Sequence, residues 1–186
     1  MYNQVKTAQE IEAMRSGGKI LATTLNELTQ QVRSGITTKS LADYAAMRLK
    51  ENGAKPETLG YQGYPDVLCV SVNDEVVHGI PKESLVLKDG DVVSLDFVVR
   101  YKGMVTDAAI TTIVGKSDKK IQRLIDTTQR SLMDGIAAIK GVTRVGDIAN
   151  AVENPLSKGG YGIVRDRVGH GVGHEMHEEP NIPNYG

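Results

Sequence analysis

This chain of 186 residues has little cysteine, no excess of charge of either sign and no long apolar run. Its single cysteine, Cys69, excludes an internal disulfide and is typical of a reducing compartment. A formal net charge of −1 gives no electrostatic reason to expect a nucleic acid or an anionic membrane as partner. No apolar stretch has the length of a membrane span, and the first residues lack the basic segment and apolar run of a secretory signal. The chain is therefore predicted to be a cytoplasmic enzyme or binding protein.

The stretch from Asp91 to Val114 contains two runs in which apolar residues alternate along the chain. Alternation places side chains such as Phe97 on one face and Asp96 on the other. A two-residue loop at Tyr101-Lys102, followed by Gly103 at a bulge position, predicts a β-hairpin. In that register Asp96 lies directly opposite Asp107, and a slip of one residue leaves the two as neighbours.

Two carboxylates this close on an apolar strand pair repel each other, and burying them uncompensated is costly. The hairpin therefore suggests either a cation between Asp96 and Asp107 or a shared proton. The alternative is a plain solvated face, on which Arg100 and Thr111 are further polar members.

The residues before this hairpin predict two helices. Thr7 and Glu10 form a capping box, and the apolar residues behind it recur at steps of three and four until Gly35. Thr38 opens a second helix, which has Gly53 near its end. The β-branched run 67–72 then predicts a strand, and the segment 76–80 is expected to pair back on it.

After residue 115 the pattern begins again. Ser117 is predicted to cap a helix whose inward side chains are Ile121, Leu124, Ile125, Leu132, Ile136 and Ile139. A shorter helix is expected at about 146–156, where Pro155 limits its end, and the segment 161–168 is expected to be extended. We therefore expect one α+β domain over residues 1–186, with a first half of about 1–115 and a second half of about 116–186.

The histidines gather in two places. His78 stands alone, whereas His170, His174 and His177 lie within eight residues, interleaved with glycines that let backbone approach closely. If 170–174 is extended, His170 and His174 share a face and His177 takes the opposite one, unless a turn intervenes. Imidazole beside carboxylates suits Mn, Fe, Co, Ni or Zn better than calcium. Hydrogen-bonded Gly-His turns without a metal are the alternative.

Three motifs together resemble one family: SVNDEVVHGIP at 71–81, the pair SLDF and TDAA, whose aspartates are eleven residues apart, and GHGVGHEMHEEP at 169–180. They look like the type I methionine aminopeptidases, and the similarity runs in order over essentially the whole chain. The resemblance implies the pita-bread metallopeptidase fold, in which two pseudo-symmetric α/β halves share a central antiparallel sheet. It also implies removal of the N-terminal methionine from nascent proteins and peptides, hence proximity to the ribosome. As the net charge indicates, no nucleic acid or membrane is expected as partner.

The resemblance also implies roles for individual residues. Asp96, Asp107 and His170 match the metal ligands, which in the family hold two divalent ions (Co, Mn, Fe, Ni or Zn). His78 and His177 match the histidines that line the site and contact substrate or intermediate. The residues that match the pocket for the methionine side chain are Tyr61, Tyr64, Cys69 and Met176. No role is assigned to His174.

The family has two further glutamate ligands near its C-terminus. Asp96 follows His78 by 18 residues, so the internal repeat predicts their equivalents near residue ~195. Because the last residue is Gly186, the second half of the fold is expected to be incomplete and this polypeptide inactive or weakly active. Two alternatives stay open: a non-catalytic peptide- or partner-binding protein that retains half of the site, and a metal-free structural module.

Overall fold

The structure, a computed structural model, describes residues 5–116 and 118–186. The chain forms two compact units. The N-terminal unit contains the described residues up to 116 together with Val172–Met176, and the C-terminal unit contains Asp118–Gly171 and His177–Gly186. Over the described residues, no helix has both the length and the apolar composition needed to cross a membrane.

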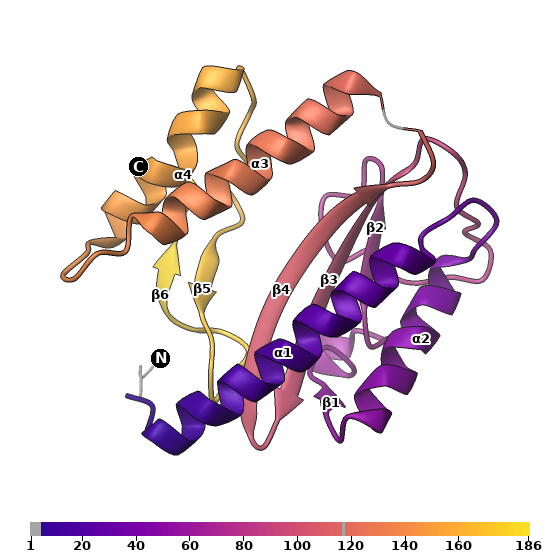
Figure 1. Cartoon of the computed structure of the whole chain (residues 1–186), viewed down its shortest axis with the longest axis horizontal. Coiled ribbons are helices and arrows are strands. Elements are labelled where there is room, and N and C mark those ends of the chain that lie inside the picture. Colours follow the sequence, from indigo (N-terminus) through magenta and orange to yellow (C-terminus); the bar gives the residue numbers. More distant parts are fainter. Residues whose placement is uncertain (1–4, 117) are drawn as a thin grey trace. The chain divides into compact units, whose positions relative to one another are not determined.

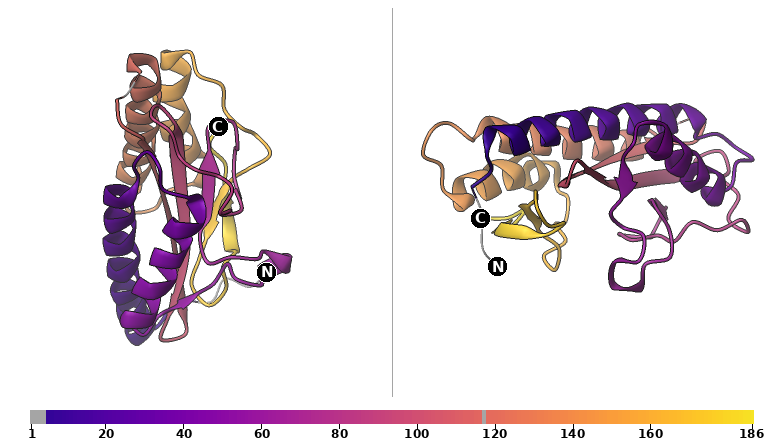
Figure 2. Two further views of the ribbon diagram at one scale, coloured as in Figure 1. Left: turned by 90° about the vertical axis from the view of Figure 1, so that its right-hand side faces the viewer. Right: turned by 90° about the horizontal axis from the view of Figure 1, so that it is seen from below.

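The N-terminal unit packs two helices on a four-stranded antiparallel sheet (Figure 1). Its elements are α1 (Ala8–Gln31), α2 (Thr38–Glu51), β1 (Lys55–Pro56), the 3₁₀ turn η1 (Tyr61–Gly63), β2 (Cys69–Val72), β3 (Val92–Tyr101) and β4 (Met104–Ile113). β3 is central, with β1 and β2 on one edge and β4 along the other. Seen edge-on, α1 and α2 lie on one side of the strands (Figure 2).

The first helix begins with the predicted capping box. The Thr7 hydroxyl accepts from the Glu10 backbone N–H, and the Glu10 carboxylate accepts from the Thr7 N–H at 2.7 Å. This exchange satisfies two of the N–H groups that a helix start leaves without a partner. α1 ends at Gln31, before the predicted stop at Gly35, and α2 begins at Thr38 as predicted, with Thr37 as its cap.

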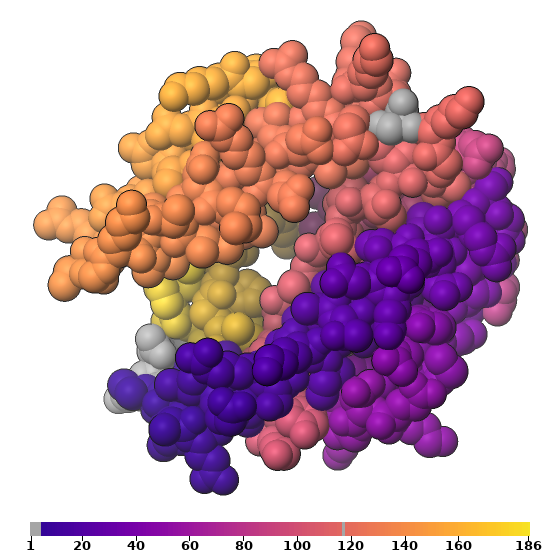
Figure 3. Space-filling model, viewed as in Figure 1, coloured from indigo at the N-terminus to yellow at the C-terminus, as the bar shows by residue number. Residues whose placement is uncertain are grey.

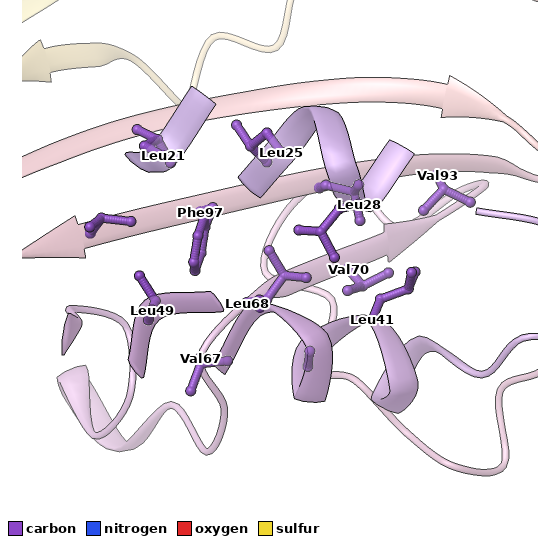
Figure 4. Close-up of a cluster of buried hydrophobic side chains, with 14 of the residues drawn as sticks. Leu21, Leu25, Leu28, Leu41, Leu49, Val67, Leu68, Val70, Val93 and Phe97 are labelled. Carbon is purple, nitrogen blue, oxygen red and sulfur yellow. The ribbon is translucent and has the colours of Figure 1, made fainter. Parts of the chain in front are cut away.

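One apolar core joins the helices to the sheet (Figure 4). Its members come from one face of each helix and from alternate positions of β3, as the helical and strand periods require. The largest side chains that are almost fully buried in it are Leu28, Leu41, Leu49, Leu68, Leu87, Leu95 and Phe97. Burying a Leu or Phe side chain contributes about 1.5–3 kcal/mol each. The core therefore fixes which face of β3 points away from the helices.

The hairpin of β3 and β4 has a different turn from the one predicted. Tyr101 pairs with Met104, so the loop is Lys102-Gly103 and contains no bulge. Both loop residues have positive φ, 48° and 85°, which is the pattern of a type I′ turn. Such a turn matches the right-handed twist of the strands, and Gly103 adopts its conformation without the strain of a Cβ.

The C-terminal unit contains α3 (Lys119–Ala137), α4 (Val145–Gly159), β5 (Gly169–Gly171) and β6 (Glu178–Ile182). Ser117, predicted as a cap, lies outside the described residues; the Asp118 carboxylate accepts from the Lys120 N–H at 2.7 Å and caps α3. α4 continues through Pro155, contrary to expectation, since one missing N–H removes a single helical hydrogen bond. The segment 161–168 contains no strand, also contrary to expectation.

The apolar side of α3 is not buried as predicted. Leu124, Leu132, Ile136 and Ile139 are between 43 % and 58 % exposed. α3 meets α4 through small residues instead: Ser131 donates to the Val152 carbonyl at 2.7 Å, and Gly135 lies against the Val152 side chain. The side chains of α3 stand out from the surface of this unit (Figure 3). Close approach of the two helices through small residues leaves the larger apolar ones outside the interface.

Candidate functional site

Asp96 and Asp107 lie on the sheet face that points away from the helices. Asp96 pairs with Ala109 and Asp107 with Val98, so the predicted directly opposed register is wrong by two residues. A shift of two preserves the face, because side chains alternate with period two. The two half-buried carboxylates are therefore diagonal neighbours, a relation in which Cα atoms lie roughly 7–8 Å apart. This spacing leaves more room for a cation between them than direct opposition does.

Cys69 on β2 lies beside this carboxylate pair. Its Cα is paired with that of Asp96. Burial, opposed by a hydrogen bond with Tyr64 and assisted by the negative charges of Asp96 and Asp107, raises the pKa of the Cys69 thiol to about 11. Cys69 is consequently a neutral thiol at pH 7 and behaves as a small apolar side chain.

Tyr64 connects this face to the loop that carries His78. Its hydroxyl lies 2.8 Å from the Gly79 carbonyl oxygen and 3.2 Å from that of Leu68. Burial, and then the hydrogen bond with Cys69, raise the pKa of the Tyr64 phenol. The phenol therefore stays protonated at neutral pH and presents its ring beside the thiol.

Backbone geometry at Gly79 explains why the segment 76–80 is not the strand that was expected. The Val70 N–H donates to the Gly79 carbonyl at 2.9 Å, and the Ser71 hydroxyl accepts from the Gly79 N–H at 3.0 Å. A Cβ at Gly79 would lie 2.2 Å from the Val70 carbonyl oxygen, so no other residue fits. His78 before it has φ of 58°, a left-handed conformation, and its side chain is exposed. The loop is thus held at Gly79 and presents His78 outward.

His170 and His177 come together in the C-terminal unit. β5 and β6 pair with a register irregularity after His170, and bends at 173–177 join them. The two imidazole centroids lie 4.4 Å apart. The bends are the intervening turn that the sequence left open, so 170–174 is not extended throughout and the condition for a common face of His170 and His174 is not met. Gly171 of this motif cannot be replaced by a larger residue without a clash, because a Cβ there would lie 2.4 Å from the Glu179 carbonyl oxygen.

A hydrogen bond of the His170 side chain determines which of its ring nitrogens carries the proton. Its Nδ1 lies 2.9 Å from the Gly171 carbonyl oxygen, so in the neutral ring Nδ1 carries the proton and donates it there. The lone pair is then on Nε2. A backbone carbonyl that orients a histidine in this way is a common arrangement for a metal ligand.

Met176 belongs to the N-terminal unit and packs on the carboxylate face. It is 6 % exposed and contacts Val98 and Val105, and Val98 is the residue directly opposite Asp107. Tyr61, the last residue predicted to line the pocket, is on η1 and is 39 % exposed. The N-terminal unit thus gathers Tyr64, Cys69, Met176 and the two aspartates around one face of its sheet.

The donors on this face fit a divalent cation. Two carboxylates share one face of this strand pair with apolar residues such as Val98 and Val105, and like charges placed this close favour a cation between them. Carboxylate oxygens with an imidazole nitrogen suit a borderline divalent metal. Among the residues that the structure describes, no group of three or more His, Cys, Asp or Glu side chains is arranged so that it could hold a metal ion.

Two contacts had no signal in the sequence. Arg100, predicted only as a polar member of a solvated face, is half-buried, and its Nε donates to the Glu57 carboxylate at 2.6 Å. His174 Nε2 lies 2.8 Å from the Glu10 carboxylate. The partners are 43 and 164 residues apart in the chain, so neither local spacing nor periodicity indicates them.

Known proteins are similar to this chain over nearly its whole length. The model of metallopeptidase family M24 matches residues 12–186. A methionine aminopeptidase of Clostridium acetobutylicum is 41 % identical over 182 residues, which cover 98 % of this chain and 73 % of that protein. The crystal structure of methionine aminopeptidase from Thermotoga maritima covers all of this chain and 74 % of its own, at 40 % identity and a TM-score of 0.97.

A more distant structure shares the fold alone. The X-Pro aminopeptidase of Thermotoga maritima is 22 % identical, with a TM-score of 0.82 over 97 % of this chain and 49 % of its own. The predicted resemblance and the predicted α+β pita-bread fold are both confirmed.

Proposed function

Because this chain belongs to metallopeptidase family M24, we propose that it removes the N-terminal methionine from nascent proteins and peptides. The observation that carries the proposal is about 40 % identity to methionine aminopeptidases over nearly the whole chain. The pair of aspartates on the hairpin face that points away from the helices supports a metal-dependent reaction. Nascent chains as substrates would place the reaction in the cytoplasm, near the ribosome.

We assign the metal-binding role to Asp96, Asp107 and His170, with two divalent ions of the Mn, Fe, Co, Ni or Zn class. Such ions, when bound, polarise a carbonyl group and lower the pKa of a water molecule. The half-buried carboxylates and the Nε2 lone pair of His170 support this assignment. The negative charge of both aspartates would also attract the protonated amine of a peptide.

We assign to His78 and His177 the roles of contacting the substrate and of stabilising the negative charge that develops on the amide oxygen. Both side chains are exposed, and a neutral or protonated imidazole can donate a hydrogen bond to an oxygen atom. Donors aimed at a developing oxyanion typically contribute about 10²–10³-fold to turnover. The fixed loop at Gly79 supports a defined direction for the His78 side chain.

Methionine would be selected by Tyr61, Tyr64, Cys69 and Met176. The neutral thiol of Cys69 and the ring of Tyr64 give an apolar surface without a charge of its own. A thioether side chain is flexible and polarizable, and it packs well on aromatic edges and on sulfur. A charged side chain would lose its hydration on this apolar surface.

A peptide assay combined with a metal count tests this function. The substrate is a Met-Ala-Ser peptide, and the control substrate is its Lys-Ala-Ser analogue. These residues cover 73 % of the length of the Clostridium relative, and the assay is run with each of the divalent metals in turn. We expect release of methionine from the first peptide in the presence of divalent metal, and little or no release of lysine from the second. If no methionine is released under any of the metals, the proposal fails, and metal binding without cleavage would favour a peptide-binding protein.

A further inference from the structure

The segment Val172–Met176 has no regular secondary structure and is held by long-range contacts. The Val105 N–H donates to the Gly173 carbonyl at 2.6 Å. Arg100 Nη1 donates to the His174 carbonyl at 3.1 Å, and the Met176 side chain is buried on β3 and β4. These contacts tie a five-residue bend to the sheet at its start, middle and end.

The side chain of His174 adds a contact to a second element, the first turn of α1. Its Nε2 lies 2.8 Å from Glu10 Oε1, and both side chains are about one-third exposed. The other oxygen, Oε2, accepts from the Thr7 N–H at 2.7 Å and from the Thr7 hydroxyl at 2.9 Å. The capping box therefore uses one carboxylate oxygen of Glu10 and leaves the other directed at His174.

Glu10 is ionised throughout the neutral range. The backbone hydrogen bond from Thr7 and then the bond from His174 lower its pKa to about 2. A carboxylate held by its own helix start costs little further ordering when it binds a second partner, since its rotamer is already fixed. The helix start is thus a rigid acceptor for an imidazole N–H.

We infer that Glu10 and His174 are a positioning pair, which holds the bend 172–176 and thereby the adjacent His177 in place for the reaction. The inference rests on the proposed function, in which His177 contacts substrate or intermediate. His177 directly follows Met176 in the chain, so disorder of the bend is transmitted to its backbone. Small displacements of a reacting group are costly to turnover, of the order of 10²-fold for about 1 Å.

The variants His174→Ala and Glu10→Gln test the pair by a kcat and KM measurement on the polypeptide that cleaves Met-Ala-Ser. Each is expected to lower kcat about 10- to 100-fold, as loss of supporting residues around a site does, while KM changes less. The double variant should be no worse than the more affected single one, because both changes break the same contact. His174→Arg supplies an N–H donor for Glu10 and should restore most of kcat.

Glu27→Gln is the matched control. Glu27 is on the same helix and binds Arg48 at 2.6 Å, with side-chain exposures of 29 % and 24 %, close to those of Glu10 and His174. This change should leave kcat unaltered even though it removes an ion pair of α1. An unchanged kcat in both His174→Ala and Glu10→Gln, or an equal loss in Glu27→Gln, would overturn the positioning role.

Amide hydrogen exchange at Val105 gives a readout that does not depend on peptidase activity. Its N–H is bound to the Gly173 carbonyl, so loosening of the bend should speed its exchange by about tenfold or more in His174→Ala. The Glu27→Gln control should exchange like the unchanged protein. If the unchanged protein cleaves no peptide, the proposed function fails, whereas faster exchange still supports the anchoring of the bend. Exchange at Val105 that is the same in all variants contradicts the anchor itself.

Discussion

Replacing Asp96 by Asn should move metal affinity and metal-free stability in opposite directions. Asp96 and Asp107 are diagonal neighbours on one sheet face, and two unit charges at roughly 7 Å in an effective dielectric of about 20 repel by about 2 kcal/mol. Asn is close to Asp in shape but has no charge. The metal-free variant should therefore be more stable by up to ~2 kcal/mol, which in a domain of this size raises Tm by several degrees.

The same change should weaken metal binding by at least 10- to 100-fold, since even residues around a ligand set have effects of that size. A 100-fold loss removes about 2.7 kcal/mol of metal-induced stabilisation when the metal is well above its Kd. The assay is thermal unfolding with and without Mn or Co, paired with calorimetric titration of the metal. Without metal, the variant should have a higher Tm than the unchanged protein. When metal is added, the Tm of the variant should rise much less than that of the unchanged protein.

Asp118→Asn is the control for a generic loss of a carboxylate. Asp118 caps α3 through the Lys120 N–H, and Asn is nearly as good a cap as Asp. This variant should keep the metal affinity and lose little stability. Equal metal affinity in Asp96→Asn and Asp118→Asn would remove the hairpin from the metal site and refute the reasoning from paired charges.

Four further outcomes are expected. His177→Ala should lower turnover about 10²–10³-fold while metal content by elemental analysis stays unchanged; loss of metal would make His177 a ligand. A peptide with N-terminal norleucine should be cleaved, because one methylene against a sulfur is worth only about 1–3 kcal/mol in such a pocket, and efficient release of lysine would contradict the pocket. Gly79→Ala should unfold at lower denaturant concentration and lose activity, because its Cβ would lie 2.2 Å from the Val70 carbonyl oxygen; unfolding at the unchanged concentration would show that the loop can shift. Glu10→Gln should lower the free energy of unfolding at neutral pH. Because the pKa of Glu10 is depressed, its carboxylate stabilises the fold above about pH 4.5, and this contribution is lost as pH falls toward 2, so the stability difference between variant and unchanged protein should shrink over that range. Acid titration followed by circular dichroism measures the difference, and a difference that stays constant from pH 7 to pH 2 would contradict this prediction.

The hairpin shows which part of the geometry could be predicted from local sequence. Alternation identified the strands and the face on which Asp96 lies, because the period of two depends only on the chain itself. The register depended on the turn, and Lys102-Gly103 with two positive φ values was not distinguished from a loop one residue earlier. The predicted strand pairing was therefore wrong by two residues. Because two is an even number, the two aspartates still lie on a common face.

The helices show a different limit. The capping box predicted where α1 begins, whereas the apolar period of α3 did not show which side of that helix is buried. Packing of α3 on α4 follows Ser131 and Gly135, two small residues that a search for apolar periodicity passes over. Helix contacts through small residues are decided by how closely two backbones approach, and that depends on the partner helix.

The histidine motif combines both kinds of information. Its glycines predicted close backbone approach, which holds at Gly171, but the direction of each ring depends on partners elsewhere in the chain. His170 is oriented by the neighbouring Gly171 carbonyl, whereas His174 is oriented by Glu10, 164 residues away. A sequence motif can therefore identify the chemistry of its histidines, while their division of labour follows from tertiary contacts. On this reasoning His174 supports a neighbour, because its accessible nitrogen Nε2 is already engaged by an ionised carboxylate of α1.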